Sequence, residues 1–504
     1  MKGIPFDGDR VIIKDGAMGT SLMRLGPAST DKPERMNLRR PEIVQGIHTE
    51  YLQAGCDIVT ANTFNVNSFP DLKETESVIQ AGIRCAREAA NRFGRGWIAM
   101  DLGPTGKMPE PYGDMPYESA VCGFTRTAAL GAESGADLIL IETMTDMREL
   151  KAAVLGAKAT GLPVVASFSV SQTGRLLSGA DVQGTAAMLE SLGVSAVGIN
   201  CGHGPATLAP FAQTLLNCVS IPAMLCPNAG PPRMQEGHAV YDVTPEQFAN
   251  EMKPLLRAGL RIAGGCCGTT PAHIQALKKA SEGWRVAPAR QQAPCWAASW
   301  RRSLNLAEGC SVIHPHTSRL SADADILCLS VDAPDAADAV ADLQMEYAAP
   351  LLLTARNEAA LVSAVRAYGG KPLLHLTGIG PYEAERVLAI MRQYGGVAVI
   401  DLAGENTASD EACLSMARDV LKEAKRFGVR AADILFKLPC RGETPYPDNL
   451  RAALPLIAAL YKELNARSVW APALSSSAFK RPEADPLFEQ AVRAGLAAVW
   501  GEVS

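Results

Sequence analysis

The chain has 504 residues, of which 47% are hydrophobic and 20% are charged, and its formal net charge at pH 7 is −5. This composition is ordinary for a soluble globular enzyme, and a chain of this length exceeds one ordinary hydrophobic core, so two domains are predicted. The charges are spread along the chain without a basic stripe, which excludes a nucleic-acid-binding surface.

The N-terminal segment and the cysteines bear on the cellular compartment. The first residues, MKGIPFDGDRVIIKDGAMGT, lack the apolar core of a signal peptide, and no apolar run approaches the ~20 residues of a membrane-spanning helix. A cytoplasmic location without membrane association is therefore expected. Thirteen cysteines is an odd number for a disulfide scaffold, and it favours thiolate chemistry or metal ligation.

The first half of the chain alternates short apolar runs with longer amphipathic stretches such as Pro41–Ala54 and Pro245–Ala258. Continuous apolar strands separated by helices indicate a parallel sheet that is buried on both faces. Eight such units fit a (β/α)8 barrel better than an open sheet. The predicted strands are Val11–Ile13, Asp57–Ala61, Trp97–Asp101, Asp137–Glu142, Pro163–Ser169, Ala196–Asn200, Ile221–Cys226 and Arg261–Gly264.

Most of these strands run into polar or glycine-rich clusters. In a (β/α)8 barrel the carboxyl ends of the strands and the loops after them build the active site, so distant clusters converge on one mouth. The clusters are Asp15-Gly16-Ala17-Met18-Gly19-Thr20, Asn62-Thr63-Phe64, Glu142-Thr143, Asn200-Cys201-Gly202-His203-Gly204 and Gly264-Gly265-Cys266-Cys267-Gly268-Thr269.

A second series of alternating strands and helices follows a stretch without periodicity, Gly283–Arg302. Seven strands are clear, with a helix at Asp410–Phe427. The predicted class is therefore α/β with two (β/α)8-type barrels, the second shortened or irregular, and the predicted domains are 1–284 and 311–504 with a linker at 285–310. The seven strands are Asp325–Val331, Pro350–Thr354, Pro372–Leu376, Val397–Leu402, Ile434–Leu438, Val469–Ala471 and Ala497–Trp500.

Three cysteines stand out because each directly follows a buried strand and is flanked by glycines. Cys201 follows one strand, and the adjacent pair Cys266-Cys267 follows another. Soft thiolates suit Zn²⁺, and three of them leave the fourth tetrahedral position open for a substrate thiol, which would bind as a nucleophilic thiolate. Judged by residue type alone, two alternatives to a metal site remain. The cysteines could be core packing residues, or the adjacent pair could form a vicinal disulfide.

The runs DGAMGTSL, ANTF, DLGPTG, IETM, GRLLSG, GINCGHGP, CPNAG and GGCCGTTPAHI together resemble the homocysteine S-methyltransferase family over roughly residues 5 to 280. That family includes betaine–homocysteine methyltransferase and the N-terminal module of cobalamin-dependent methionine synthase. The resemblance implies that Cys201, Cys266 and Cys267 are catalytic zinc ligands. It also implies that Asn228 occupies the fourth position when substrate is absent.

The same resemblance assigns the substrate contacts. Asp15 and Glu142 match the acidic residues that receive the homocysteine ammonium, which needs a carboxylate partner. Backbone N–H groups of Gly16, Ala17 and Met18 are expected to take the substrate carboxylate. The alternative for the two acids is a helix cap or a salt bridge at the barrel rim. His203 is left outside the catalytic set.

The second half resembles, more faintly, the folate-binding barrel that follows the homocysteine module in methionine synthase. That family binds the pterin ring with Asp and Asn at strand ends, and an unpaired buried polar group costs roughly 1–3 kcal/mol. Folate binding is therefore not expected, unless Asp332 or Asp401 supplies the contacts. The residues at the matching positions are Cys328, Ser330, Thr354, His375, Lys437 and Pro439.

The predicted function is methylation of homocysteine to methionine by a zinc-dependent S-methyltransferase. The sequence contains no Asp-x-His-x-x-Gly run of the kind that ligates cobalt. The preferred donor is a methylcorrinoid (methylcobalamin) carried by a partner protein that docks in trans. The alternative is a small sulfonium or betaine donor, with the second half serving only as an interaction or dimerisation module. A zinc-storage role would leave the amino-acid-binding carboxylates without a purpose.

Overall fold

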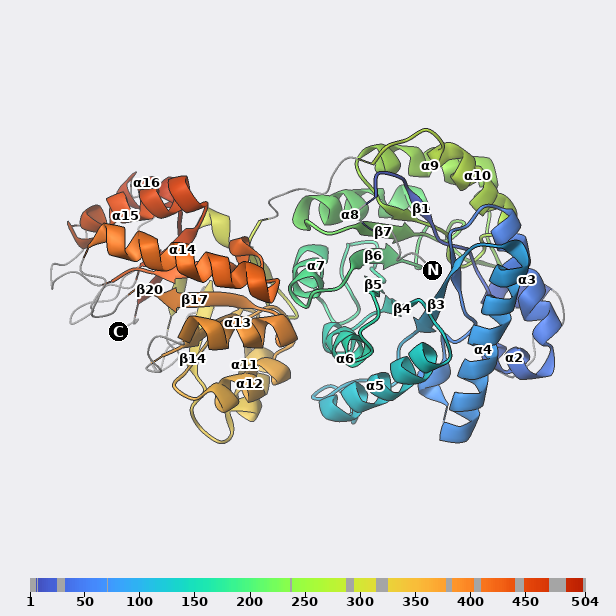
Figure 1. Ribbon diagram of the computed structural model, residues 1–504, viewed down its shortest axis with the longest axis horizontal. Helices are drawn as coiled ribbons and strands as arrows, with labels where there is room; N and C mark the ends of the chain where they lie inside the picture. The colour runs from blue at the N-terminus through green and yellow to red at the C-terminus, as the bar shows by residue number, and fades with distance from the viewer. Residues whose placement is uncertain are drawn as a thin grey trace. The chain divides into compact units, whose positions relative to one another are not determined.

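The computed structural model describes residues 6, 8–24, 32–69, 71–235, 238–286, 294–313, 325–377, 383–402, 409–439, 448–470 and 486–501. By contacts the chain divides into two compact units, 1–182 with 194–291 and 183–193 with 292–504. Each contains one barrel of parallel strands (Figure 1). The predicted α/β class with two (β/α)8-type barrels is confirmed, whereas the predicted domain boundaries stay a prediction.

The first barrel contains eight parallel strands in the sheet order β1-β10-β7-β6-β5-β4-β3-β2. An isolated parallel bridge between Lys14 and Ile58 joins the two ends of this order. Each predicted strand corresponds to an observed one, with ends that shift by at most two residues. The strands are β1 (Ile12–Ile13), β2 (Ile58–Thr60), β3 (Trp97–Leu102), β4 (Leu138–Met144), β5 (Val164–Phe168), β6 (Ala196–Asn200), β7 (Ala223–Cys226) and β10 (Ile262–Ala263).

Helices follow these strands, and local side-chain caps set several of their boundaries. Asp71 accepts a hydrogen bond from the Lys73 amide at the start of α4, and Asp146 accepts from the Arg148 and Glu149 amides at the start of α6. Thr244 and Gln247 form a capping box on α9. The main helices are α3 (Pro41–Gln53), α4 (Leu72–Phe93), α5 (Tyr117–Glu133), α6 (Met147–Lys158), α7 (Val182–Ser191), α8 (Pro205–Cys218), α9 (Pro245–Arg257) and α10 (Pro271–Ser281).

Apolar side chains fill the interior of the first barrel, which explains why its strands read as continuous hydrophobic runs. Ile12, Leu140, Val165, Met224 and Ile262 belong to one buried cluster. Their burial on both faces of the sheet is typical of parallel strands covered by helices. The polar side chains of the predicted site lie instead at the carboxyl ends of the strands.

The second barrel is closed by eight parallel strands, one more than the sequence predicted. The additional strand is β13, which pairs with both β14 and β20. The barrel is shortened, because its strands lie between residues 310 and 501, and irregular, because the register shifts between Ser468 and Val469. The strands are β13 (Cys310–Ile313), β14 (Ile326–Ser330), β15 (Leu351–Ala355), β16 (Leu373–Leu376), β17 (Val397–Asp401), β18 (Ile434–Lys437), β19 (Arg467–Trp470) and β20 (Leu496–Gly501).

The stretch predicted as a linker contains an antiparallel hairpin of two short strands, β11 (Trp296–Ala298) and β12 (Ser303–Asn305). The helices of the second unit are α11 (Ala336–Glu346), α12 (Glu358–Ala367), α13 (Glu383–Tyr394), α14 (Asp410–Phe427), α15 (Asp448–Leu464) and α16 (Pro486–Ala494). Among the described residues, no helix is long and apolar enough to cross a bilayer.

A buried ion pair holds the amino-terminal ends of two strands of the second barrel together. Lys371, which precedes β16, donates from Nζ to Asp433 Oδ1 at 2.6 Å, and Asp433 precedes β18. Burial opposes ionisation, but the cations of Lys371 and Arg430 hold the pKa of Asp433 at about 2. This end of the barrel is therefore stabilised by charges at the opposite ends of the same strands from the polar residues of the mouth.

Candidate functional site

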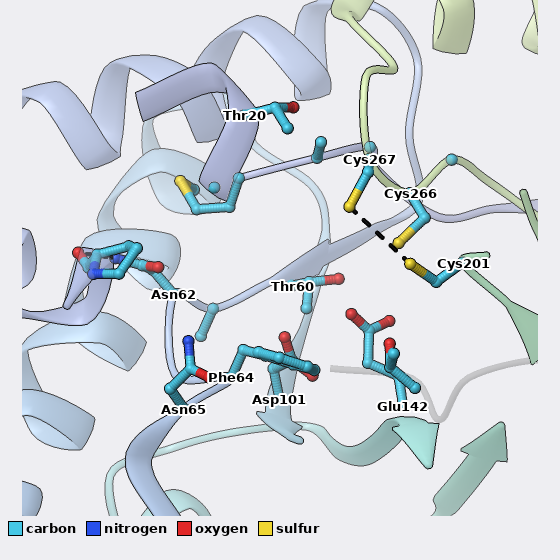
Figure 2. Close-up of a pocket in the computed structure, with 18 of the residues that line it drawn as sticks. Thr20, Thr60, Asn62, Phe64, Asn65, Asp101, Glu142, Cys201, Cys266 and Cys267 are labelled. Carbon is cyan, nitrogen blue, oxygen red and sulfur yellow. Dashed lines mark hydrogen bonds between the residues drawn. The ribbon is translucent and has the colours of Figure 1, made fainter. Parts of the chain in front are cut away.

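A cavity of about 250 Å³ opens at the carboxyl ends of the first barrel's strands (Figure 2). Its lining comes from the carboxyl ends of β2, β3 and β4 and from the segments after β1, β2, β6 and β10, and includes Glu142, Cys201, Cys266 and Cys267. The sequence clusters therefore do meet at one mouth. Figure 2 shows the three cysteines on one side of the pocket, with Glu142 and Asp101 facing them.

The sulfur atoms of Cys201, Cys266 and Cys267 all lie within 4.8 Å of one another. The distance between Sγ of Cys201 and Sγ of Cys267 is 3.9 Å. The backbone holds this arrangement, because the Cys201 amide donates to the Cys226 carbonyl at 3.1 Å and the Cys266 amide donates to the Pro227 carbonyl at 2.8 Å. The end of β7 thus fixes both cysteine loops.

The adjacent pair Cys266-Cys267 reaches the cluster because glycines let the loop turn tightly. A Cβ on Gly265 would lie 2.3 Å from Thr269 Oγ1, and Gly268 has a φ of +79° with Tyr241 packed against it. Cys201, which directly follows β6, has a φ of +61°, a left-handed conformation that non-glycine residues rarely adopt. Such strain at a cluster of thiols is typical of a functional site.

The chemistry of this cluster fits a soft divalent metal. Hydrogen bonds from Cys201 and Cys266 lower the pKa of Cys267 to about 3, whereas hydrogen bonding with its two neighbours raises the pKa of Cys266. Asn228, two residues after the end of β7, is buried, and its Oδ1 atom has no hydrogen-bond partner within the described ranges. Three clustered thiols are a donor set of the kind that binds Zn²⁺, and the predicted role of Asn228 as a fourth ligand stays a prediction.

The two predicted substrate carboxylates occupy different positions. Glu142 lines the cavity, and burial raises its pKa. Asp15 is fully buried and lies outside the lining, where its Oδ2 accepts from the Thr60 amide and its Oδ1 from the Thr60 hydroxyl, both at 2.7 Å. Burial also raises the pKa of Asp15. The cavity therefore presents Glu142, but not Asp15, to a ligand.

Gly16, Ala17 and Met18 line the cavity, and their predicted contact with the substrate carboxylate stays a prediction. The Ala17 amide donates to Thr269 Oγ1 at 3.3 Å, and the Tyr51 hydroxyl donates to the Ala17 carbonyl at 3.0 Å. A Cβ on Gly16 would lie 2.6 Å from Thr269 Oγ1, so only glycine fits there. This loop is held against the cysteine loop that contains Thr269.

His203 serves the site through its backbone. Its amide donates to the Cys201 carbonyl at 2.8 Å, and its carbonyl accepts from the Asn228 amide at 2.9 Å. These two bonds connect one cysteine loop with the buried asparagine.

Three charged residues of the cavity were not singled out from the sequence. Lys14, Glu34 and Asp101 all line it and are all almost completely buried. Lys14 Nζ lies 3.3 Å from Asp15 Oδ1 and 3.8 Å from Glu142 Oε2. Lys14 could have been recognised because it directly precedes Asp15, a predicted site acid. Asp101 could have been recognised because it is the first residue of the run DLGPTG, which the family resemblance includes.

At the mouth of the second barrel, four polar side chains from successive strands form one chain of hydrogen bonds. Thr354 Oγ1 lies 3.1 Å from His375 Nδ1, and His375 Nε2 lies 3.1 Å from Asp401 Oδ2. Lys437 Nζ lies 2.9 Å from Asp401 Oδ1. The strand register explains the chain, because Thr354 pairs with His375 and Asp401 pairs with Lys437.

The other positions compared with the pterin site are spread out. Cys328 is buried in the barrel core, Ser330 is exposed at the end of β14, and Pro439 follows β18. Asp332 Oδ1 accepts from the Arg356 amide at 2.7 Å. The two aspartates considered as replacements for the pterin contacts therefore both have partners within the protein.

Comparison with known proteins gives a family. A model of the homocysteine S-methyltransferase family matches residues 12–281. The methionine synthases of Mycobacterium tuberculosis and Mycobacterium leprae are 33% and 32% identical over 293 residues, and the match spans 54% of this chain but only 24% of each relative. Crystal structures of the Escherichia coli homocysteine methyltransferase MmuM align with TM-scores of 0.45 (apo) and 0.47 (metallated). They are 25% and 24% identical and cover 55% and 54% of this chain and 98% and 96% of theirs. Because the family model matches more than half of its residues, this chain belongs to the homocysteine S-methyltransferase family.

Proposed function

We propose that this protein methylates the sulfur of homocysteine to form methionine. The observation that carries the proposal is the meeting of three cysteine sulfurs and a buried carboxylate, Glu142, in one cavity of a homocysteine S-methyltransferase barrel. The thiolate end and the amino-acid end of one small substrate can be bound there together.

Zinc is the metal that the donor set favours, with Cys201, Cys266 and Cys267 as its ligands and Asn228 Oδ1 as the fourth in the absence of substrate. Bound Zn²⁺ would lower the pKa of the substrate thiol and leave its sulfur nucleophilic.

The residues of the chain bind and orient the substrate. A buried carboxylate pairs with the substrate ammonium. The loop of Gly16, Ala17 and Met18 provides backbone amides for the substrate carboxylate, and the Ala17 amide would exchange its present partner, Thr269 Oγ1, for the substrate. Holding the thiol in one orientation supplies the positional part of catalysis. In the reaction the bond between the methyl carbon and the donor breaks, a carbon–sulfur bond forms, and the thiol proton leaves to solvent.

The methyl donor in this proposal is a methylcorrinoid carried by a partner protein in trans. The two Mycobacterium relatives are methionine synthases, and the match to them covers 24% of their length, so most of each relative lies outside the match. The alternative donor is a small sulfonium or betaine. The acidic lining of the cavity is the observation that favours a cationic donor.

One experiment tests the proposal and separates the donors. The full chain, loaded with zinc, is incubated with homocysteine and either free methylcobalamin, methyltetrahydrofolate, S-methylmethionine or betaine, and methionine is measured. Methylcobalamin should support methionine formation, and Cys266→Ser should abolish it, whereas Cys226→Ser, which removes a buried cysteine outside the cluster, should keep it. If no donor yields methionine and homocysteine does not bind, the proposed function is wrong.

A further inference from the structure

The first barrel contains a fixed ammonium where a substrate ammonium was expected. Lys14 ends in the barrel interior with its side chain 5% exposed, and its Nζ contacts Asp15 Oδ1 at 3.3 Å. The same Nζ lies 3.8 Å from Glu142 Oε2. Because Asp15 also accepts two hydrogen bonds from Thr60, both of its oxygens already have partners. Asp15 therefore already has a partner on each oxygen, and it lies outside the cavity lining.

Asp101, at the end of β3, shows the opposite pattern. It is 5% exposed, it lines the cavity, and its Oδ1 atom has no hydrogen-bond partner within the described part of the chain. Figure 2 shows it beside Glu142 on the side of the pocket across from the cysteines. Leaving a buried carboxylate oxygen unpaired is unfavourable, so this atom can accept a hydrogen bond from a bound ligand.

The electrostatic surroundings agree with this assignment. Burial, followed by the charge of Glu142, raises the pKa of Asp101 well above its ordinary value, and Lys14 opposes that shift. Two neighbouring buried carboxyl groups that share too little positive charge attract a cation. An ammonium bound between Asp101 and Glu142 would supply that charge.

We propose that Asp101, together with Glu142, receives the ammonium of the amino-acid substrate, and that Lys14 is a positioning residue that engages Asp15 and keeps it from this role. This inference rests on the proposed function, because it assumes that the cavity binds homocysteine. It changes the expected contact from Asp15 to a residue on the third strand.

Binding of two thiols that differ only in the amino group tests the inference. The zinc-loaded full chain is titrated with homocysteine and with 4-mercaptobutanoate, which has the same chain length, thiol and carboxylate. Asp101→Asn should weaken homocysteine binding by about 10- to 100-fold, the range for losing a hydrogen bond to a charged group, and should leave 4-mercaptobutanoate binding unchanged. Asp15→Asn should keep the ratio of the two affinities near that of the unmodified protein.

Two controls keep the outcome interpretable. Asp71→Asn changes an exposed helix cap outside the cavity, where asparagine caps equally well, and should alter neither affinity. Lys14→Met should make homocysteine binding sensitive to Asp15→Asn, which a merely structural role of Lys14 would not do. Unchanged 4-mercaptobutanoate binding shows that a variant's cavity is intact.

The inference is overturned if Asp101→Asn keeps the affinity ratio or if Asp15→Asn alone removes it. Failure of the unmodified protein to bind either thiol overturns the proposed function instead, so the two failures are distinguishable.

Discussion

Replacing Lys14 with methionine should destabilise the first barrel by several kcal/mol. The substitution keeps the volume of the side chain but removes the ammonium from two buried carboxylates. At an effective dielectric constant of ~20, a unit-charge pair contributes about 5 kcal/mol at 3.3 Å and about 4 kcal/mol at 3.8 Å, the distances to Asp15 and Glu142. The cost of burying Lys14 offsets part of this, and breaking a buried pair by removing one partner typically costs about 3–5 kcal/mol.

The cost should also depend on pH. Lys14 lowers the pKa of Asp15 and Glu142 against the effect of burial, so in Lys14→Met both folded-state pKa values rise further above their unfolded values. An acid with a raised folded pKa binds more protons in the folded state, so its stability contribution falls as pH rises from about 4 towards that raised pKa. The variant should therefore lose more stability at pH 8 than at pH 5.

Hydrogen exchange of the full chain measures this effect in the first barrel alone. Peptides that cover β1 and β2 report the free energy of opening there, without assuming that the two barrels unfold together. Adding Asp15→Asn to Lys14→Met should recover about 2 kcal/mol, because it removes one uncompensated charge. A loss below about 1 kcal/mol, or a loss that is equal at pH 5 and pH 8, would refute the assigned role of this ion cluster.

Three further outcomes are expected. In metal analysis, Cys266→Ala should lose most of its bound zinc while staying folded, and the control Cys226→Ala should keep its zinc. Stoichiometric zinc in Cys266→Ala would contradict the ligand assignment. Burial and the charge of Asp401 raise the pKa of Glu383 from 4.5 to about 7, so this carboxyl lowers stability as pH rises through that window. Glu383→Gln should remove that loss, about 1–2 kcal/mol after allowance for partial exposure, in urea unfolding at pH 5 and pH 8. Equilibrium titration of the full chain with methyltetrahydrofolate should show no micromolar binding, because Lys437 and His375 both contact Asp401. A micromolar dissociation constant would make methyltetrahydrofolate the leading candidate for the methyl donor.

The barrel architecture was predictable because buried parallel strands leave a strong local signal. Runs such as Ala196–Asn200 are apolar throughout and end in glycine and polar residues, so both the strand and its place at the mouth can be recognised. The strand at Cys310–Ile313 was missed because four residues next to a nonperiodic stretch carry no comparable pattern. Its pairing with β14 and β20 depends on residues that are distant in the chain.

The site was predicted in part for a related reason. The three cysteines could be grouped because glycines and strand ends mark each of them locally. The burial of Lys14 could not be recognised, because a lysine at the end of a strand ordinarily reaches solvent. Here its partners are the adjacent Asp15 and a glutamate at the end of β4, and only the closed barrel brings that glutamate to Lys14.

The closed second barrel also bears on how such a protein can change during evolution. Its sheet has no free edge, its apolar core includes Leu352, Val399 and Leu435, and its buried Lys371–Asp433 pair lies at the amino-terminal end. Mutations at the opposite mouth therefore alter ligand chemistry while the residues that keep the barrel folded are left untouched. A barrel of this kind can lose one ligand and persist as a scaffold on which selection builds another surface.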